Sequence, residues 1–434
     1  MMEKKVLRNT YSLCPYCLRR LPAKHVKMDD KIYLQKECPD HGFFSTIIWR
    51  GKTDISKWIG NTPEIAEHEN VNCPSNCGIC SEHLQGTCCT LLEVTKRCNL
   101  NCKFCFADER NNTDPDLDKV NGWLKKLVVP GKTLVQLSGG EPTVRDDLPE
   151  IVEAAKKAGC KYIQLNSNGI RLAQDVEYVK KLSEAGLSFV FMQFDGTDDE
   201  IYRKLRGSNL LDIKKKAIEN CAAYNIGVTL VPMVVPGVNT HNIGEIIKFA
   251  VKNSPAVRGV HFQPVSYFGR VPEIPEDSMR YTLDELLINI EKQTNGLIKA
   301  KNLLPSCCDH PLCGFHGDFV ILPNKIIALS KKNSTGTECC CNKVGSADNN
   351  REFVGRRWKR TSDSEQINPG NKEFNIHDMD FFLKRVRSHG FTVTAMAFQD
   401  AGNIDLERLR RCSLHVFDDG KLVPFCSYYL TPWR

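Results

Sequence analysis

Residues 91–105 read LLEVTKRCNLNCKFC, an apolar run that leads directly into a loop with three cysteines. Apolar runs of the length of a buried strand recur along the chain at Leu91–Thr95, Leu134–Ser138, Tyr162–Asn166, Phe189–Phe194, Val228–Val234 and Gly259–Pro264. Helical patterns lie between them at Leu148–Ala158, Val176–Ala185, Leu211–Tyr224 and Ile243–Lys252. Apolar strands that alternate with helices predict parallel βα units with both faces of the sheet covered. Six units in succession predict an α/β fold, a partial (β/α)6 TIM-like barrel, with a doubly wound open sheet as the alternative.

Composition divides the chain into three regions. Residues 1–89 are polar and rich in cysteine, residues 90–270 carry the strand and helix patterns, and residues 271–434 become rich in cysteine again. A proline-rich link, Val271–Pro275, follows the second region. Residues 331–373 are polar and lack periodicity, which predicts a loop-like insertion in the third region. We therefore expect a central barrel with a metal-binding region on each side of it.

Cysteine is unusually frequent, with 21 in a chain of 434 residues. The N-terminal stretch carries charges and cysteines where a signal peptide would be apolar, which predicts a cytoplasmic protein whose thiols stay reduced. Cys160 and Cys221 fall in helical stretches and are expected to be simple buried thiols. The other cysteines cluster at ligand-like spacings and therefore predict several metal sites.

The loop after the first predicted strand places Cys98, Cys102 and Cys105 at CxxxCxxC spacing. Three thiolates can hold three corners of a 4Fe–4S cube and leave the fourth iron without a protein ligand. An open iron can bind a chelating molecule, and S-adenosylmethionine (SAM) fits through its amino and carboxylate groups. A zinc or electron-transfer site with a remote fourth thiolate is the alternative. The C-terminal end of a barrel strand is where chemistry is expected in this fold.

The second predicted strand ends in a Gly-Gly-Glu-Pro motif at residues 139–142. This motif and the cysteine loop resemble those of the radical SAM superfamily over about residues 90–270. The resemblance implies that Cys98, Cys102 and Cys105 hold the catalytic cluster and that the motif contacts SAM through Gly139, Gly140, Glu141 and Pro142. It also implies that Asn166, Asn168 and Asp195 approach the ribose and methionine parts of SAM, although these residues also suit simple turns.

A separate metal site is predicted near the N-terminus. Cys14 and Cys17, followed by Cys38, look like two knuckles of a zinc-ribbon or rubredoxin-like site. The fourth ligand, His41 or another cysteine, stays open at this stage, as does the choice between iron and zinc. Two unrelated turns are the alternative interpretation.

Two further sets of cysteines are expected to hold iron–sulfur clusters. One set precedes the first barrel strand and the other lies in the third region: Cys73, Cys77, Cys80 and Cys88, and then Cys308, Cys313, Cys412 and Cys426. A ligand exchange between the first set and the N-terminal site stays open. His83 is expected to be satisfied without binding metal, and Cys339–Cys341 are expected not to bind, because adjacent cysteines point in different directions.

These cysteine sets resemble one branch of the superfamily over Thr10–Thr431, the archaeal tetraether lipid synthase group and its bacterial relatives. Members of this branch have also been described as dihydropterin methyltransferases. The resemblance implies three 4Fe–4S clusters and one mononuclear iron (or zinc). It implies C–C bond formation between isoprenoid lipid chains as the reaction. C-methylation of a dihydropterin is the alternative, and a non-catalytic iron–sulfur electron-transfer protein is a distant one.

Charge and hydropathy limit the partners. A formal charge of +7 is mild for this length and predicts no nucleic-acid surface. No stretch approaches the ~18 apolar residues of a membrane span. The basic run Arg356–Arg360 suits either lipid phosphates or solvent, so peripheral membrane contact stays open. We expect a lipid or small-molecule substrate and an electron donor such as ferredoxin or flavodoxin.

Overall fold

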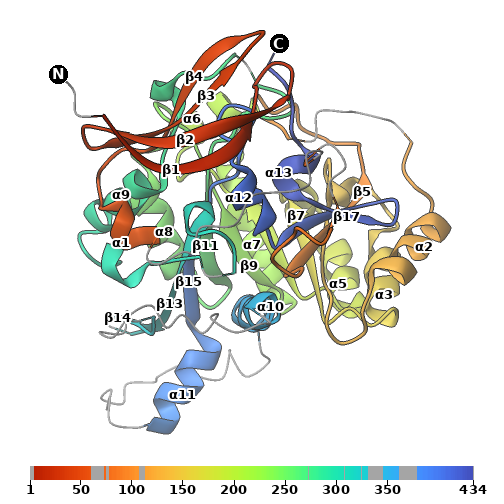
Figure 1. The fold of residues 1–434 in the computed structure, drawn as a ribbon. Coiled ribbons are helices and arrows are strands. Elements are labelled where there is room, and N and C mark those ends of the chain that lie inside the picture. Colours follow the sequence, from red (N-terminus) through yellow and green to blue (C-terminus); the bar gives the residue numbers. More distant parts are fainter. Residues whose placement is uncertain are drawn as a thin grey trace.

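The computed structural model describes residues 4–59, 73–74, 78–106, 113–271, 273–306, 308–323, 325–330, 346–360 and 379–433. Strands in these residues form two sheets, one of four strands near the N-terminus and one of thirteen strands that contains the barrel (Figure 1). The C-terminal end of the described chain lies against the N-terminal sheet, since the backbone N–H of Trp433 donates to the carbonyl of Pro15 at 2.8 Å.

The N-terminal sheet is an antiparallel meander. It consists of β1 (Lys4–Leu13), β2 (Arg20–Met28), β3 (Lys31–Cys38) and β4 (Gly42–Trp49), and the short helix α1 (Ile55–Ile59) follows. Side chains of this sheet fix it to the C-terminal part of the chain. His25 Nε2 lies 2.8 Å from Asp405 Oδ2, and Lys36 Nζ donates to the carbonyl of Ala401 at 3.0 Å. The sheet is therefore packed onto the barrel and does not stand apart from it.

Six parallel strands form the barrel arc, in sequence order: β5 (Cys89–Thr95), β6 (Leu134–Gly139), β7 (Tyr162–Ser167), β8 (Phe189–Gln193), β9 (Gly227–Val231) and β11 (Val257–Pro264). The six predicted strands are thus confirmed. One apolar run divides into β9 and the short β10 (Met233–Val234), because Pro232 between them has no N–H for the ladder. The strand order never reverses, as it would in a doubly wound sheet, so the partial barrel is confirmed.

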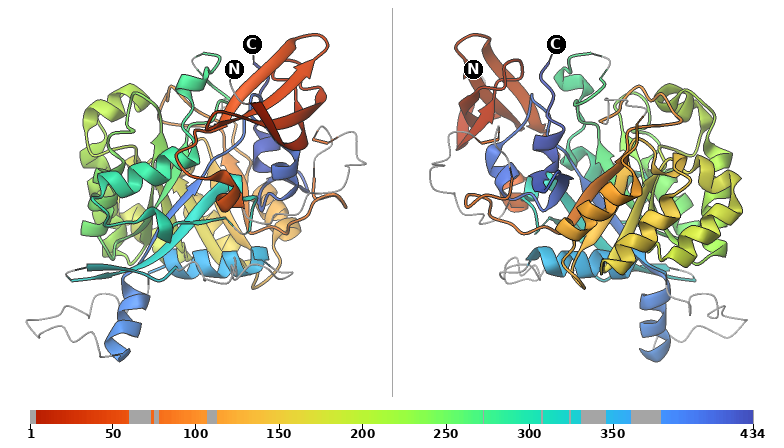
Figure 2. Two further views of the ribbon diagram at one scale, coloured as in Figure 1. Left: turned by 60° about the vertical axis from the view of Figure 1, so that its left-hand side comes forward. Right: turned by 90° about the vertical axis from the view of Figure 1, so that its right-hand side faces the viewer.

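Helices connect these strands and cover the outside of the arc (Figure 2). Their bounds are α2 (Leu117–Leu127), α3 (Leu148–Lys157), α4 (Ile170–Gln174), α5 (Val176–Ala185), α6 (Asp199–Arg206), α7 (Leu211–Ala223), α8 (Ile243–Lys252) and α9 (Leu283–Gln293), with short 3₁₀ turns at Pro142–Val144, Asp277–Met279, Ala300–Asn302 and Pro311–Cys313. The start and end of α5 follow from local chemistry. The Asp175 carboxylate accepts the N–H of Tyr178 at the start, and Gly186 takes a left-handed conformation (φ 105°) at the end.

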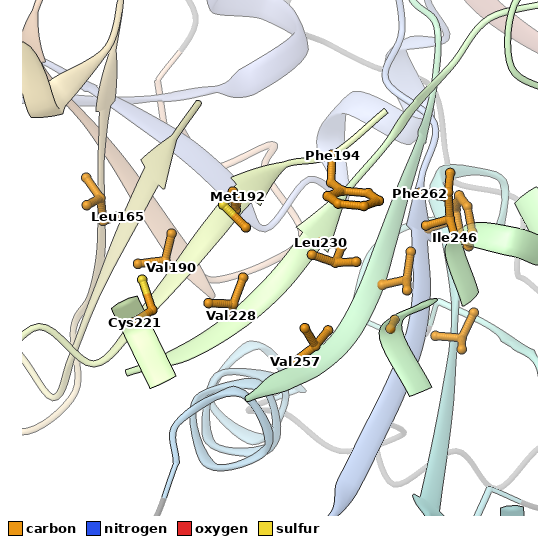
Figure 3. Packing of buried hydrophobic residues seen from close by; sticks show 14 of the residues in the cluster. Leu165, Val190, Met192, Phe194, Cys221, Val228, Leu230, Ile246, Val257 and Phe262 are labelled. Atoms are coloured by element: carbon orange, nitrogen blue, oxygen red, sulfur yellow. The ribbon is translucent and has the colours of Figure 1, made fainter. Parts of the chain in front are cut away.

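The core lies between the strands and the helices (Figure 3). Val190, Met192 and Leu230 project from neighbouring strands into this layer and are fully buried. Cys221 joins them from α7, and burial raises the pKa of its thiol to about 12. This confirms Cys221 as an apolar core residue. Cys160 is only partly buried but packs against the same core.

The C-terminal region extends the barrel at both edges. At one edge β15 (Gly390–Met396) runs parallel to β11, and β13 (Gly314–Leu322) pairs antiparallel with β15. At the other edge β16 (Leu414–Asp418) runs parallel to β5 and continues into the hairpin strand β17 (Lys421–Pro424). The short strands β12 (Leu304–Pro305) and β14 (Lys325–Ala328) border β13. The sheet therefore continues across the boundary that composition places at residue 270.

The polar insertion contains a helix that sequence periodicity did not predict. Helix α10 (Ser346–Trp358) packs at the N-terminal ends of the strands (Figure 2), where the Trp358 ring meets Phe189 edge to face, with 5.6 Å between the ring centroids. Arg351 is buried and donates to the carbonyl of Cys88, so a charged residue occupies part of the packed face and hides the helical pattern. Residues 331–345 and 361–373 of the predicted insertion lie outside the described residues.

The remaining helices are α11 (Met379–Ser388), α12 (Leu406–Arg410) and α13 (Phe425–Tyr428). Figure 1 shows α11 projecting away from the barrel. The basic run beside α10 is largely bound within the protein: Arg357 pairs with Asp318 at 2.5 Å, and Arg360 donates to the carbonyl of Ala222 at 2.8 Å. Of the helices described, none has the length and hydrophobicity that crossing a bilayer requires.

Candidate active site

A cavity of about 360 Å³ occupies the interior of the barrel arc. The three cysteines of the loop after β5 line it, together with Gly139 and Gly140 at the end of β6. C-terminal strand ends are where a barrel of this kind carries its chemistry. The structure thus brings the predicted cysteine loop and the glycine motif to one place.

The cysteine loop is held in position by three neighbouring segments. Cys105 exchanges backbone hydrogen bonds with Arg270 at 3.2 and 2.8 Å, and the N–H of Lys103 donates to Leu205 at the end of α6 at 3.2 Å. The Asn168 side-chain amide donates to Asn99 Oδ1 at 2.7 Å. These hydrogen bonds hold the loop without using the thiols.

The donor set of this loop suits an iron–sulfur cube. Cys98, Cys102 and Cys105 form no disulfide and line one cavity. Burial raises the pKa of Cys98 to about 11, and the neighbouring Glu141, Cys102 and Cys105 add to this shift. A positively charged centre would favour the thiolates, because metal binding to thiols releases their protons.

The two glycines are required by close contact within the chain. A Cβ on Gly139 (φ 124°) would lie 2.0 Å from the carbonyl oxygen of Thr95, and one on Gly140 would lie 2.1 Å from that of Arg97. The N–H of Gly140 donates to Thr95 and that of Glu141 to Arg97, each at 2.8 Å. Only glycine at these two positions allows the loop after β6 to lie against the start of the cysteine loop. The spacing of the motif alone did not reveal this requirement.

The Glu141 carboxylate is fully engaged within the protein. It accepts hydrogen bonds from the Thr143 hydroxyl at 2.6 Å, the Ser167 hydroxyl at 2.8 Å and the Asn168 N–H at 2.6 Å. Burial raises its pKa, and these donors oppose the shift. Pro142 begins the short turn that this carboxylate caps. Glu141 thus joins the loops after β6 and β7 and positions Asn168 for its contact with the cysteine loop.

Asp195 and Asn166 have different environments. Asp195 is completely buried and accepts two hydrogen bonds from Arg206 at 2.7 and 2.9 Å, while Asn166 lines the cavity and donates to Ser138 Oγ at 3.2 Å. Burial lowers the pKa of Arg206, but Asp195 and then Cys102 raise it, and the result lies above the ordinary value. Arg206 also lines the cavity, so its ion pair with Asp195 keeps a positively charged guanidinium beside the cysteine loop. Sequence reasoning missed Arg206, because an arginine at a helix end is an ordinary surface residue.

Three cysteines and one histidine converge in the N-terminal sheet. The ligand atoms of Cys14, Cys17, Cys38 and His41 all lie within 4.8 Å of one another. The left-handed conformation of Leu18 (φ 56°) turns the chain between the first two knuckle residues and the next strand. Three thiolates and one imidazole suit a single tetrahedral zinc or iron ion. Of the two options for the fourth ligand, the structure places His41 at the site.

The structure brings one member of the first predicted cysteine set beside one member of the second. Cys88 and Cys308 are buried side by side with Ala347, and Cys88 lines the cavity. Burial, Asp309 and then the Cys426 and Cys313 thiols raise the pKa of Cys412, which places these three cysteines in one region.

Cys73, Cys80 and the neighbouring His83 each have separate surroundings. Cys73 packs partly buried against the apolar cluster that contains Cys426, whereas Cys80 is exposed. His83 donates to the carbonyl of Cys412 at 2.7 Å, which gives it a protein partner as expected. Cys77, Cys307 and Cys339–Cys341 lie outside the described residues.

Comparisons with known proteins identify the class. The model of the radical SAM superfamily matches residues 92–250, and that of the HMPTM N-terminal zinc ribbon domain matches residues 6–50. The chain belongs to the radical SAM superfamily and is a radical SAM enzyme. Membership brings SAM and a 4Fe–4S cluster as cofactors.

Three individual proteins show which members of the superfamily this chain is similar to. The chain is 34% identical to the 7,8-dihydro-6-hydroxymethylpterin dimethyltransferase of Methanocaldococcus jannaschii, over 98% of this chain and 93% of that protein. A probable GTP 3',8-cyclase of Methanococcus aeolicus is 30% identical over 40% of this chain and 59% of its own length. The crystal structure of SuiB from Streptococcus suis bound to the precursor peptide SuiA has a TM-score of 0.41 and 18% identity, and the match covers 49% of this chain and 46% of that one.

Proposed function

We propose that this enzyme methylates a C–H carbon of a dihydropterin with two molecules of SAM. One SAM is cleaved reductively and its 5'-deoxyadenosyl radical takes the hydrogen atom, while a second SAM gives its methyl group and leaves as S-adenosylhomocysteine; an external electron donor supplies one electron for each SAM. The relative that matches nearly the whole chain is a dihydropterin dimethyltransferase, which supports the alternative reading of the sequence over coupling of isoprenoid chains. The proposed substrate class is a reduced pterin that carries a 6-hydroxymethyl group.

A group of side-chain amides in a cavity whose lining is otherwise largely apolar is the structural observation that carries this proposal. Gln136 and Gln164 stand opposite each other on β6 and β7, and Gln164 donates to Asn166 Oδ1 at 3.0 Å. Barrel interiors are ordinarily filled by branched apolar side chains. The Cys89 thiol donates to Gln136 Oε1 at 3.3 Å, so each amide keeps only part of its hydrogen-bonding capacity for a ligand. Leaving that part unpaired against a lipid chain costs about 1–3 kcal/mol, so a lipid is the poorer match for this wall. A flat heterocycle with several donors and acceptors pairs with it.

Aromatic faces complete the cavity. Phe191 and Trp358 lie 4.5 Å apart between ring centroids near the strand N-termini, and Phe106 and Phe425 approach at 5.7 Å near the cysteine loop. Small-molecule sites combine apolar walls of this kind with a few placed polar groups. The aromatic rings exclude water, which protects a reactive radical from side reactions.

The roles of the chain at the mouth of the cavity follow from its contacts. When bound, the cluster supplies the electron that cleaves SAM to methionine and a 5'-deoxyadenosyl radical, the species that takes a hydrogen atom from an unreactive C–H bond. Cys98, Cys102 and Cys105 hold it. Glu141 and Asn168 keep their loop in place, and Arg206 lends positive charge beside Cys102.

Further metal sites form part of the proposal. We assign one mononuclear zinc or iron to Cys14, Cys17, Cys38 and His41, a ligand set that is compact enough for a single ion. Two additional 4Fe–4S clusters are proposed for the remaining cysteine sets, and the Cys88–Cys308 contact indicates that ligands from both sets share a site.

The test is a comparison of substrates. The enzyme is reconstituted with iron and sulfide without oxygen, reduced with dithionite, and given SAM with the 6-hydroxymethyl dihydropterin, with an archaeal diether lipid, or with neither. We expect the pterin alone to stimulate 5'-deoxyadenosine formation and to gain one or more methyl groups by mass spectrometry. A Cys98→Ala variant is the negative control. If the lipid alone stimulated 5'-deoxyadenosine formation, dihydropterin methylation would be refuted in favour of C–C coupling between lipid chains. If neither compound stimulated it, both substrates would be refuted.

A further inference from the structure

The wall of the cavity opposite the amides also carries polar side chains. It is built by β11, β15 and β13, whose registers place His261, Thr394 and His316 in one row across the three strands. Gln263 lies two residues beyond His261 on the same face of β11, because side chains alternate along a strand. All four residues line the cavity.

Two members of this wall lack a side-chain partner within the described part of the chain. The His261 ring nitrogen Nδ1 is 2.8 Å from the Thr394 hydroxyl, so this pair is satisfied internally. The His316 ring and the Gln263 side-chain amide make no side-chain hydrogen bond to any residue that the structure describes. Both side chains are half-buried and line the cavity, so water or a ligand in the cavity can supply the missing partner.

The protonation state of His316 fits hydrogen bonding to a neutral ligand. Burial lowers its pKa below the ordinary value, so the ring is neutral at pH 7 and offers one donor and one acceptor. Gln263 offers a carbonyl oxygen and an amino group. Together, His316 and Gln263 present uncharged donors and acceptors. Such groups suit a lactam or an aminopyrimidine better than a phosphate or a carboxylate.

We propose that His316 and Gln263 hold the polar edge of the heterocyclic substrate and so determine its orientation in the barrel. This inference rests on the proposed function. A dihydropterin carries an amino group, a ring N–H and a carbonyl along one edge, and the Gln263 amide complements two of these at once. His316 lies two strands away from β11, about 10 Å at the ordinary strand spacing, which leaves room for a bicyclic ring between the side-chain tips.

Binding measurements test the proposal separately from catalysis. Anaerobic titration calorimetry of the holoenzyme, with SAM present and no reductant, gives the pterin dissociation constant without turnover. We expect Gln263→Met and His316→Ala each to raise this constant about tenfold, the effect of losing one buried hydrogen bond. SAM affinity is expected to stay within about twofold, because neither residue is near the glycine motif in the strand register. Met396→Leu, a cavity residue of similar volume between them on β15, is the matched control.

The outcomes separate the inference from the proposed function. Wild-type affinity for the pterin in both variants would overturn the inference and leave the proposed function intact. Absence of pterin binding to the wild-type holoenzyme would overturn the proposed function, and the inference with it. If His316→Ala fails to fold, Gln263→Met carries the test, since methionine has nearly the volume of glutamine. An equal loss of SAM affinity in that variant would show a general distortion and refute the specific role.

Discussion

Lys214 is a charged residue in an unusual place, and its replacement tests the buried network behind the active site. It lies on α7 with its side chain completely buried, and Nζ donates to the carbonyl of Asn168 and to Gln193 Oε1. Desolvation lowers its pKa to about 7, although Asp195 opposes this shift. Lys214→Met keeps the length of the side chain and removes the titrating group.

The sign and size of the effect follow from proton linkage. An unfolded lysine has a pKa of about 10.4, so between pH 7 and that value the unfolded chain binds a proton that the folded chain does not. The free energy of unfolding therefore rises with pH in this window. Integrated from pH 7 to pH 9, the contribution of Lys214 is about 2 kcal/mol. The same rise is expected to be missing from Lys214→Met.

The assay is urea unfolding of wild type and variant at equal metal loading, without oxygen, at pH 7, 8 and 9. The difference between their pH slopes isolates Lys214, because every other titrating group is common to both proteins. Lys216→Met is the matched control: it lies on the same helix but is exposed and pairs with Glu219 at 3.3 Å. The variant will be less stable overall, since two acceptors lose their donor. An unchanged pH slope in Lys214→Met would refute the buried, largely neutral lysine.

Three further substitutions address the metal sites and the ion pair. Cys102→Ala is expected to abolish 5'-deoxyadenosine formation, while the metal of the N-terminal sheet is retained. Chromatography measures the 5'-deoxyadenosine and elemental analysis measures the metal. Residual cleavage of SAM would contradict Cys102 as a ligand of the catalytic cluster. His41→Ala should lower the zinc or iron content by one ion per chain, with no loss of the catalytic cluster's absorbance; unchanged metal content would contradict His41 as a ligand. Asp195→Asn should lower the free energy of unfolding by about 3–5 kcal/mol, because Arg206 stays buried without a carboxylate; an effect below about 1 kcal/mol would show that the pair is solvated.

Local patterns explain why the barrel was predictable from the sequence. Each of the six strands is a short apolar run flanked by turn residues, and the predicted helix at Val176–Ala185 has the same bounds in the structure. The strands β15 and β16 were not predicted. Their assignment depends on pairing with β11 and β5, which lie far away in the sequence, and an isolated run such as Leu414–Asp418 carries no signal of that partner.

The candidate site was likewise predictable where its residues are close in the sequence, and not where distant loops meet. The CxxxCxxC spacing is local, so it predicted the loop that the structure places at the cavity. The spacing could not reveal that both carboxylate oxygens of Glu141 accept hydrogen bonds from within the chain, or that Arg206 lies beside Cys102. These facts arise where loops from different strands meet. For the same reason sequence proximity placed Cys88 in the set with Cys80, whereas tertiary packing places it against Cys308.

The open edges of the barrel link stability to specificity. A six-stranded arc leaves two strand edges with unpaired backbone groups, which natural sheets must cover. Here β15 covers the edge of β11, and β16 covers the edge of β5. The strand that covers the first edge carries Thr394 and supports β13 with His316, so it also supplies the polar wall of the cavity. Weakening β15 would therefore do more than destabilise the sheet, because the same ladder fixes where His316 faces the amides on β6 and β7.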